Sequence, residues 1–320
     1  MTKRPGPAHA RARERVDGVL LLDKPVGMSS TRALGRARFL LGARKAGHGG
    51  TLDPLASGLL PLLFGEATKF AGDSLEADKV YLAEVTLGRS TDTGDDEGRE
   101  IARREPVRDE AVLRAALASF VGPVEQVPPM HSALKHEGRP LYELARAGVT
   151  VERRPRQVTI HAIDLLQFAP PLVRLRVHCS KGTYVRTLAI DLGERLGCGA
   201  FLNALRRERV GALDVADAVD PVRLEAMDPV ARRACLLPID ALMQELPRID
   251  LDALAAQRFA HGQRLPLADP PVRAGSTAGR AVSHVCAPAA GRVRVYGAGR
   301  LLGLARQADG ELQPLRLVSA

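Results

Sequence analysis

The stretch AGHGGTLDPLASGLL, residues 46–60, places one histidine and one carboxylate among small residues. Glycines at 47, 49 and 50 permit a tight turn or a close approach of the backbone to another molecule. Asp53 is the only acid of the stretch, and Pro54 follows it directly. Because an Asp-Pro pair is also common in ordinary turns, two interpretations stand. The stretch is either a turn that leads into a buried strand or a site built around Asp53.

Several other chemistries lack the residues that they require. GARKAGHG, residues 42–49, has the glycine spacing of a phosphate loop, but His48 and Gly49 stand where Lys and Ser or Thr are needed. The sequence contains no H-E-x-x-H, no G-x-S-x-G and no G-x-G-x-x-G after a strand. Its four cysteines form no C-x-x-C pair, which argues against a cysteine zinc site and against a disulfide framework. We therefore predict no metal ligands.

Composition points to a polyanionic partner. The net charge is +9, which favours nucleic acid, and the basic run at Arg206, Arg207 and Arg209 is interpreted as a set of phosphate contacts. Aromatic residues are scarce, with seven Phe, four Tyr and no Trp, so a groove lined by many base-stacking platforms is not expected. Any RNA is then recognised by its shape and by one or two extruded bases.

No apolar run approaches the ~18 residues of a membrane span, so no membrane association is expected. Residues 1–16 are basic and lack an apolar core, which excludes a secretory signal. We predict a disordered arm there, which either touches phosphates or is simply a solvated tail. The predicted location is the cytoplasm, because the cysteine pattern fits a reducing compartment.

Apolar periodicity predicts the main elements. Strands are expected at the run before Lys24, at 79–89 with Tyr81, Ala83, Val85 and Leu87 on one face, and at 172–179. Helices are expected at 30–42, capped by Ser30 or Thr31 and ended by Gly42, at 108–122, ended by Gly122, and at 186–197. Strands and helices in no strict alternation predict an α+β fold with a mostly antiparallel, mixed sheet flanked by helices.

Several motifs resemble those of one known family. GHGGTLDPLASGLLPLLFGEATKF is similar to the signature of the pseudouridine synthases, most closely of the bacterial TruB family that modifies position 55 in the T-arm loop of tRNA. Further matching blocks follow in the same order, and they are GVLLLDKPVGMSS, KVYLAEVTLGRSTDTGDDEG, VPPMHSALKHEGRPLYELARAG, CSKGTYVRTLAIDLG and LNALRRERVG. Gly49 and Thr51 stand where the family usually has Thr and Ser, and Ser57 replaces a common Thr.

The resemblance implies a domain organisation and a partner. It implies a catalytic domain at 17–245 with a T-arm-binding insertion at 124–150. A small all-β, PUA-like RNA-binding module is expected at 246–320, interrupted by a flexible insertion at 268–291 that is rich in Ala, Gly, Pro and Ser. The implied partner is tRNA, and the implied enzyme is a monomer without a guide RNA. No cofactor is expected, because the isomerisation involves no redox change.

The resemblance also assigns catalytic residues. Asp53 corresponds to the catalytic aspartate, and Arg186 to the arginine that pairs with it. Tyr81 corresponds to the tyrosine that stacks on the target uracil and is placed to help remove the C5 proton. From the residues alone, Tyr81 also fits a core tyrosine and Arg186 fits a surface arginine on a helix.

Four further positions are implied to contact or support the substrate. His48 corresponds to the loop histidine that contacts RNA where the base has left the stack, although a satisfied turn histidine is the alternative. Tyr184 and Leu205 correspond to residues that line the uracil site. Lys24, with Pro25, matches a motif that supports the floor of that site.

The required chemistry fits these residue types. Uridine must be detached at its C1′–N1 bond, turned and rejoined through C5, and a carboxylate either attacks as a nucleophile or takes a proton from the sugar. An ionised carboxylate in a dry site is costly unless it is paired, and an arginine favours its charged form. Two other classes stay open, namely an RNA-binding or folding factor without catalysis and a guide-RNA-dependent synthase subunit.

Overall fold

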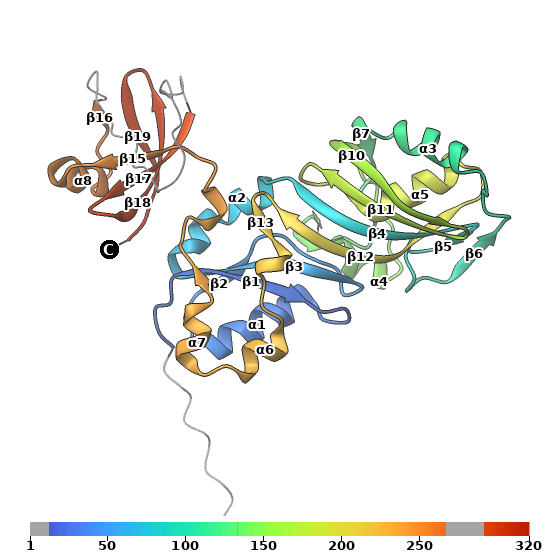
Figure 1. The fold of residues 1–320 in the computed structure, drawn as a ribbon, viewed down its shortest axis with the longest axis horizontal. Helices are drawn as coiled ribbons and strands as arrows, with labels where there is room; N and C mark the ends of the chain where they lie inside the picture. Colours follow the sequence, from blue (N-terminus) through green and yellow to red (C-terminus); the bar gives the residue numbers. More distant parts are fainter. Residues whose placement is uncertain (1–12, 133, 267–290, 320) are drawn as a thin grey trace, which may run out of the picture.

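The protein is represented by a computed structural model that describes residues 13–132, 134–266 and 291–319. Its largest part is a ten-stranded sheet with the order β14-β1-β3-β12-β4-β11-β10-β7, to which β2 adds on β3 and β13 on β12 (Figure 1). The strands of this sheet are β1 (Gly18–Lys24), β2 (Ala46–His48), β3 (Ala56–Phe64), β4 (Lys79–Leu87), β7 (Gly122–Gln126), β10 (Arg156–Ala169), β11 (Leu172–Cys179), β12 (Ala200–Val210), β13 (Leu213–Asp214) and β14 (Leu236–Leu237). Neighbouring strands pair antiparallel, except that β12 and β3 run parallel. The predicted mixed, mostly antiparallel sheet is confirmed.

Helix α1 (Ser30–Leu41) shows how the sequence sets its ends. Gly42 ends it in the left-handed conformation that glycine adopts without strain, as predicted. The N-cap is Ser29, whose side chain accepts a hydrogen bond from the backbone N–H of Arg32, so the predicted cap at Ser30 or Thr31 is wrong by one or two residues. Ser30 is buried and bonds elsewhere, which leaves Ser29 free to cap.

Helix α3 (Glu110–Ala118) ends four residues before the predicted end at Gly122. Gly122 instead begins β7, which pairs with β10. The chain must leave the helix early because Phe120 is buried in the core, so tertiary packing overrides the helical pattern. Helix α5 (Val185–Arg195) follows β11 as predicted.

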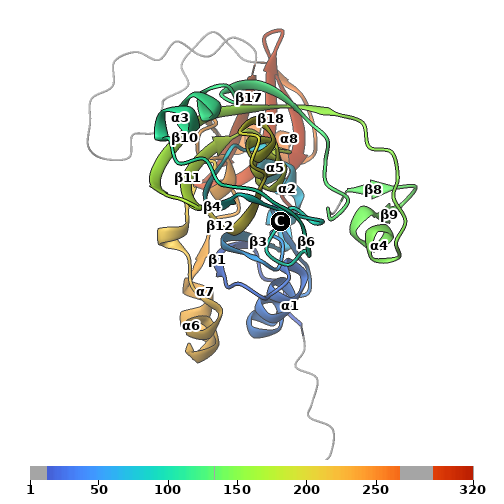
Figure 2. The same ribbon diagram turned by 90° about the vertical axis from the view of Figure 1, so that its right-hand side faces the viewer.

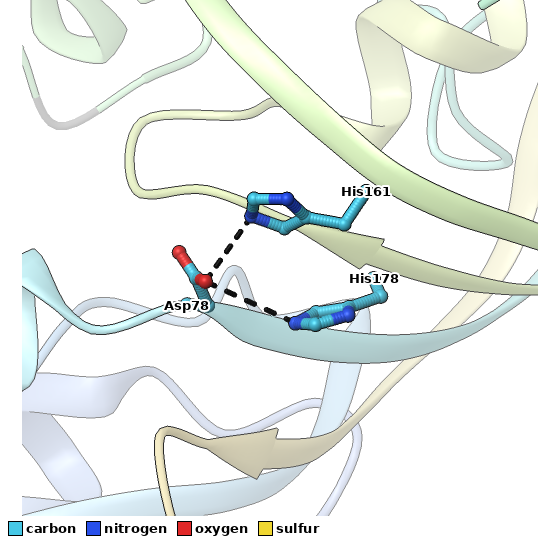
Figure 3. Close-up of side chains that lie close together, drawn as sticks. All are labelled: Asp78, His161 and His178. Atoms are coloured by element: carbon cyan, nitrogen blue, oxygen red, sulfur yellow. Dashed lines mark ion pairs between the residues drawn. The ribbon is translucent and has the colours of Figure 1, made fainter. Parts of the chain in front are cut away.

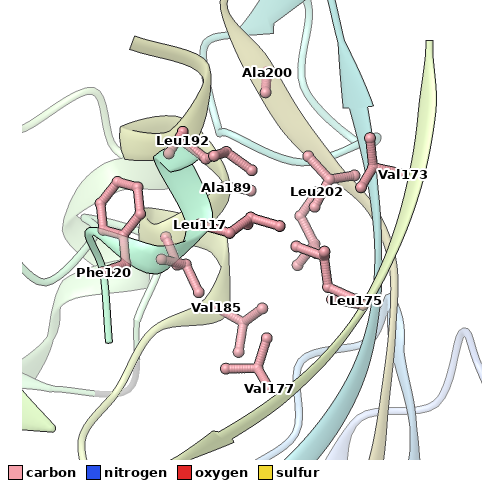
Figure 4. Close-up of a cluster of buried hydrophobic side chains, with 14 of the residues drawn as sticks. Leu117, Phe120, Val173, Leu175, Val177, Val185, Ala189, Leu192, Ala200 and Leu202 are labelled. Atoms are coloured by element: carbon pink, nitrogen blue, oxygen red, sulfur yellow. The ribbon is translucent and has the colours of Figure 1, made fainter. Parts of the chain in front are cut away.

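Two apolar clusters lie against one side of the large sheet. The first joins α3 and α5 to β4, β10, β11 and β12 (Figure 4). The second joins α1 to β1 and β3. Tyr81 and Leu205 pack against both clusters, so they mark the line along which the two halves of the sheet meet.

The register divides the side chains of this sheet between two faces. Directly opposed residues on neighbouring strands point to the same face. Tyr81 opposes Val177 and Arg207, and all three lie on the face covered by α1, α3 and α5, here termed the inner face. Arg174, Arg176 and His178 alternate onto the opposite side, termed the outer face, as the sequence pattern of β11 predicts.

A second, five-stranded sheet has the order β15-β17-β18-β19-β16 and is packed against α8 (Ala253–Ala260) (Figure 1). Its strands are β15 (Arg248–Leu251), β16 (Leu265–Pro266), β17 (Gly291–Gly297), β18 (Arg300–Ala308) and β19 (Glu311–Leu317). Phe70, Met243 and Leu304 form an apolar contact between this sheet and the rest of the chain. The expected small all-β module is confirmed, whereas the expected insertion at 268–291 lies outside the described residues apart from Gly291.

The predicted boundary of the basic arm at residue 16 lies too far along the chain. Residues 1–12 lie outside the described part of the chain, but Glu14 exchanges backbone hydrogen bonds with Gly42 and Arg44, and Val16 is buried. The apolar side chain of Val16 joins the cluster under α1, so the chain is already packed against the core at this residue.

The segment predicted as a T-arm-binding insertion leaves the sheet after β7. It contains β8 (Lys135–His136), β9 (Arg139–Pro140) and α4 (Leu141–Arg146), which stand clear of the sheet in Figure 2. The remaining short elements are η1 (Gly65–Phe70), α2 (Ala71–Glu76), β5 (Arg89–Thr91), β6 (Glu100–Arg103), η2 (Val215–Asp217), α6 (Pro221–Ala226), α7 (Pro229–Ala234) and η3 (Ala241–Met243). Within the described ranges, the helices are too short or too polar to cross a membrane.

Candidate active site

The loop between β2 and β3 carries Asp53, and side chains hold its backbone nearly residue by residue. Ser74 of α2 donates a 2.7 Å hydrogen bond to the carbonyl oxygen of Gly49. A Cβ atom on residue 49 would lie 2.1 Å from Ser74 Oγ, so Ser74 leaves room for nothing larger than glycine. This contact gives a steric reason for the departure from the family pattern at residue 49.

Arg207 of β12 holds the next part of the loop. Its guanidinium donates to the carbonyl oxygens of Leu59 at 2.8 Å, Gly50 at 3.2 Å and Thr51 at 3.5 Å. The side chain is almost fully buried, and this burial lowers its pKa. A buried cation is costly unless it is hydrogen-bonded, and here backbone carbonyls supply the bonds. Arg207 therefore fixes the loop to the inner face of the sheet.

Buried Ser30 fixes the residue before the aspartate. Its hydroxyl group bonds to both the backbone N–H and the carbonyl oxygen of Leu52, at 2.8 and 2.9 Å. On the other side of Asp53, the carbonyl oxygen of Pro54 accepts a 2.8 Å bond from the N–H of Gly27. Such anchoring positions a functional side chain on a rigid support.

Asp53 and Arg186 meet across this site. Arg186 lies in the first turn of α5, with its side chain 6% exposed, and forms an ion pair with Asp53 through Nη2. Its Nε bonds to buried Asp95 at 3.1 Å. The Asp53 side chain is 43% exposed, so the pair combines a fixed arginine with a carboxylate that solvent or a substrate can reach. The predicted pair is therefore present, and the surface interpretation of Arg186 is wrong because Arg186 is buried.

Tyr81 and Leu205 lie beside this pair on the inner face. Tyr81 is directly opposite Arg207 across β4 and β12. Burial raises the pKa of Tyr81, Arg207 opposes the rise and Asp53 adds to it, so the hydroxyl stays neutral at ordinary pH. Leu205 lies two residues before Arg207 and packs against both apolar clusters. The core interpretation of Tyr81 holds, and its assignment to the site stays a prediction.

Lys24 supports the loop that follows β1. Its side chain is fully buried, and Nζ donates to the carbonyl oxygens of Pro25 at 2.9 Å and Met28 at 2.7 Å. Burial lowers the pKa of Lys24 to about 8, against the opposite effect of the Asp53 carboxylate. Lys24 therefore holds the loop after β1, and the support of the uracil site that the motif implies stays a prediction.

His48 and Tyr184 lie on different elements, at the end of β2 and at the start of α5. His48 ends β2, and its buried Nδ1 has no hydrogen-bond partner among the described residues. Burial and then Arg207 lower its pKa, which favours the neutral ring. Tyr184 precedes α5, and its backbone N–H and C=O bond to the side chain of Gln126 at 2.9 and 3.3 Å. Burial raises the pKa of Tyr184, and the Asp53 charge adds to the rise.

The interpretation of the run at 206–209 as phosphate contacts is wrong for Arg207, which is buried and holds the loop. Arg206 is on the outer face and pairs with Asp23 through two bonds of 2.9 and 2.7 Å. A run of basic residues in the sequence does not show which side chain points inward. Strand alternation predicts only that the side chains of Arg206 and Arg207 point to opposite faces. Asp95, the second partner of Arg186, was also missed, because STDTGDDEG resembles an ordinary polar turn.

Residues that could hold a metal are not gathered at Asp53. Among the described residues, Asp53 belongs to no group of His, Cys, Asp and Glu side chains close enough to hold a metal ion, and its ion-pair partner is the cation Arg186. The cluster of potential ligands that the structure does contain, Asp78, His161 and His178, lies on the outer face.

Comparisons with known proteins agree with this geometry. Residues 38–185 match a family model described as TruB family pseudouridylate synthase (N terminal domain). Residues 186–251 match the tRNA pseudouridylate synthase B C-terminal domain, and 247–318 match Pseudouridine synthase II TruB, C-terminal. A protein of Burkholderia mallei (strain ATCC 23344) named tRNA pseudouridine synthase B is 57% identical over 313 residues, covering 98% of this chain and 97% of that protein.

The chain belongs to the TruB family of pseudouridine synthases. A TruB family relative of Ralstonia nicotianae (strain ATCC BAA-1114 / GMI1000), also named tRNA pseudouridine synthase B, is 54% identical and covers 99% of this chain and 98% of its own length. As a TruB family member, the chain is an enzyme that isomerises uridine to pseudouridine in RNA.

Solved structures share the TruB fold at low identity. A chain in a crystal structure of a Cbf5-Nop10-Gar1 complex has a TM-score of 0.69 at 23% identity, covering 94% of this chain and 84% of that chain. A chain from a structure of an H/ACA RNP bound to a substrate RNA has a TM-score of 0.68 at 22% identity, covering 95% of this chain and 85% of that chain. These likenesses establish the fold of the TruB family enzyme.

Proposed function

We propose that this enzyme converts uridine 55 in the T-loop of tRNA to pseudouridine, with Asp53 as the catalytic carboxylate. The observation that carries the proposal is the ion pair between buried Arg186 and the accessible carboxylate of Asp53 on a loop held by Ser30, Ser74 and Arg207. The tRNA substrate is supported by the names of relatives that match nearly the whole chain.

The proposed chemistry assigns each neighbour a task. Asp53, held in place by its ion pair with Arg186, attacks or deprotonates the nucleoside so that the C1′–N1 bond breaks. The freed uracil turns and bonds to C1′ through C5, which releases Asp53 if it had attacked as a nucleophile. N1 takes up a proton and the C5 proton leaves, so the product is an isomer of the substrate. Tyr81 stacks on the uracil and helps to remove this proton, while Tyr184 and Leu205 hold the ring. His48 braces the RNA where the base has been extruded, an extrusion that costs a few kcal/mol.

RNA binding is assigned to three surfaces. Residues 124–150 contact the T-arm, and the module at 246–320 contacts the remainder of the tRNA. A groove of about 790 Å³ includes the exposed Arg32, which is suited to phosphate oxygens, whereas its Arg36 and Arg206 are paired with Glu225 and Asp23. The enzyme acts as a monomer in the cytoplasm, needs no cofactor and selects its site without a guide RNA.

The proposal is tested with purified full-length protein and a T-arm minihelix whose uridines carry tritium at C5. Bond formation at C5 expels that hydrogen, so tritium appears in water in step with pseudouridine. Release of one tritium per RNA, without added guide RNA or cofactor, is expected. A minihelix with cytidine at position 55 is the matched control and should release none. Activity that required a guide RNA would support a guide-dependent subunit, and binding without release would support a non-catalytic RNA-binding factor.

A further inference from the structure

Two histidines and an aspartate meet on the outer face of the large sheet (Figure 3). His161 of β10 and His178 of β11 have ring centroids 4.7 Å apart. Asp78 immediately precedes β4, and its Oδ2 lies 3.1 Å from Nε2 of His161 and 4.0 Å from Nε2 of His178. The three potential ligand atoms all lie within 4.8 Å of one another.

The strand register brings these side chains together. Ile160 pairs with Cys179 and Ala162 with His178, so His161 is the extra residue of a β-bulge. A bulge redirects a side chain, and here it places the His161 ring beside that of His178. On the next strand pair, Lys79 opposes Cys179, so Asp78 stands just before the ladder and next to both rings (Figure 3).

Buried Lys79 fixes the position of Asp78. Its Nζ donates to the carbonyl oxygens of Ser74, Leu75 and Ala77 at 3.0, 2.8 and 2.5 Å. The backbone of the adjoining residue, Asp78, is therefore anchored on one side, while its side chain stays at the surface. The carboxylate needs only side-chain rotation to approach the two imidazoles more closely.

We propose that Asp78, His161 and His178 bind one Zn²⁺ ion. Two imidazole nitrogens and one carboxylate oxygen form a ligand set that zinc takes in proteins, with a fourth position left to water. The Nε2 atoms of both histidines have the same carboxylate oxygen as their neighbour. Ligand atoms of one tetrahedral zinc lie about 3.3 Å apart, given Zn–N and Zn–O distances near 2.0–2.2 Å. The ligand atoms lie within 4.8 Å of one another, so these exposed side chains must rotate to reach that spacing.

The surroundings favour a divalent cation. Asp78 and His178 border a groove of about 780 Å³ that also contains Asp164 and Glu245. Two arginines of the groove are already engaged by acids, since Arg176 pairs with Glu208 at 2.8 Å and Arg209 with Asp214 at 3.7 Å. The carboxylates of Asp164 and Glu245 therefore contribute negative charge to the groove that His178 borders.

The site serves stability rather than isomerisation, because it lies on the face opposite Asp53. A bound ion links the start of β4 to β10 and β11. Any ligand that binds the folded chain alone raises the midpoint of thermal unfolding. Zinc should therefore stabilise the protein without being needed for pseudouridine formation.

The test uses full-length, untagged protein that has been treated with EDTA and then dialysed. Titration calorimetry with Zn²⁺ should show one equivalent bound, and His161→Gln should weaken this binding at least ~10-fold, the lower end of what loss of even a supporting partner costs a metal site. His136→Gln, which changes an exposed histidine on β8, is the matched control and should bind Zn²⁺ like the wild type.

Thermal unfolding provides the second measurement. Zn²⁺ should raise the unfolding midpoint of the wild type and of His136→Gln, but not that of His161→Gln or Asp78→Asn. Equal Zn²⁺ binding by the wild type and His161→Gln would overturn the proposal, as would absence of stoichiometric binding. A midpoint that responds to pH but not to Zn²⁺ would reduce the cluster to a histidine–aspartate ion pair and would also overturn it.

Discussion

The two faces of the large sheet use the same basic residue types and give them different partners. On the inner face, Lys24, Lys79 and Arg207 are buried and donate to backbone carbonyl oxygens. On the outer face, side chains that are more than a third exposed pair with carboxylates, and these pairs are Arg174 with Glu84, Arg176 with Glu208 and Arg206 with Asp23.

The difference in partner decides what each cation does. A carbonyl oxygen satisfies the N–H donors of a buried cation but carries no net charge, so the inner face keeps its positive charge near Asp53. A carboxylate neutralises the cation, and an exposed pair of this kind is worth about 0–1 kcal/mol. The inner cations therefore position the active-site loop and set the electrostatic field around it, whereas the outer pairs contribute little more than surface charge balance.

The largest expected effect comes from Asp53→Asn. The amide preserves the shape of the side chain but is neither an anionic nucleophile nor an effective base. Pseudouridine formation should slow at least ~10³-fold, the scale on which loss of a catalytic nucleophile is felt. RNA affinity should stay near that of the wild type, because phosphate contacts dominate binding. The measurements are a single-turnover time course and a binding curve on one T-arm RNA.

Asp164→Asn is the outer-face control for this change, since Asp164 is exposed on β10. It should turn over like the wild type. Wild-type turnover by Asp53→Asn would refute the catalytic assignment. The two faces of the sheet would then show no difference in catalytic function.

Arg207→Met tests the buried cation directly. It removes charged hydrogen bonds to three backbone carbonyls and leaves these buried acceptors without donors, so the free energy of unfolding should fall by about 3 kcal/mol. Arg174→Met on the outer face should cost less than ~1 kcal/mol. Urea unfolding of both variants checks the contrast, and equal losses would show that burial does not separate the two faces.

Arg186→Lys keeps the charge but removes the planar fork that reaches both Asp53 and Asp95. We expect the rate to fall by about 10²-fold, as when a positioned donor is removed from an active site. Arg176→Lys, which alters an outer-face pair, should leave the rate within twofold. If Arg186→Lys also leaves the rate within twofold, Arg186 acts only as a general positive charge.

The smallest effect concerns pH. Burial lowers the pKa of Lys79 from its ordinary 10.5 to about 8. Between these values the unfolded chain keeps a proton that the folded chain has lost, so the free energy of unfolding should rise with pH across this window. The slope from one such lysine is at most ~1.4 kcal/mol per pH unit. Urea unfolding between pH 7.5 and 10 should show a smaller rise for Lys79→Met than for the wild type, and an identical rise would contradict the effect of burial.

Much of this arrangement could be predicted from the sequence. Strict alternation in β11 separates Val173 and Leu175 from Arg174 and Arg176, and period-two side-chain geometry then fixes their faces. The Asp53 loop was recognisable because glycine-rich motifs with one acid are specific when several matching blocks accompany them. The pairing with Arg186 also followed from the resemblance and is present in the structure.

Other features depend on contacts between distant segments. The burial of Arg207 depends on the parallel pairing of β12 with β3, which no local sequence pattern predicts. The meeting of His161 with His178 needs the bulge in β10, since unbroken alternation says nothing about a one-residue shift in register. The early end of α3 depends on Phe120 finding the core, a tertiary effect that overrides helical propensity.

The contact between Gly49 and Ser74 constrains how this sequence can change over time. A Cβ atom at residue 49 would lie 2.1 Å from the serine hydroxyl and 2.5 Å from the serine Cβ, so the first substitution in this pair has to occur at residue 74. Serine-to-glycine there would open the space, and only then does a threonine at 49 become accessible. In related lineages the two positions should therefore vary together, in that order, although 25 residues separate them in the chain.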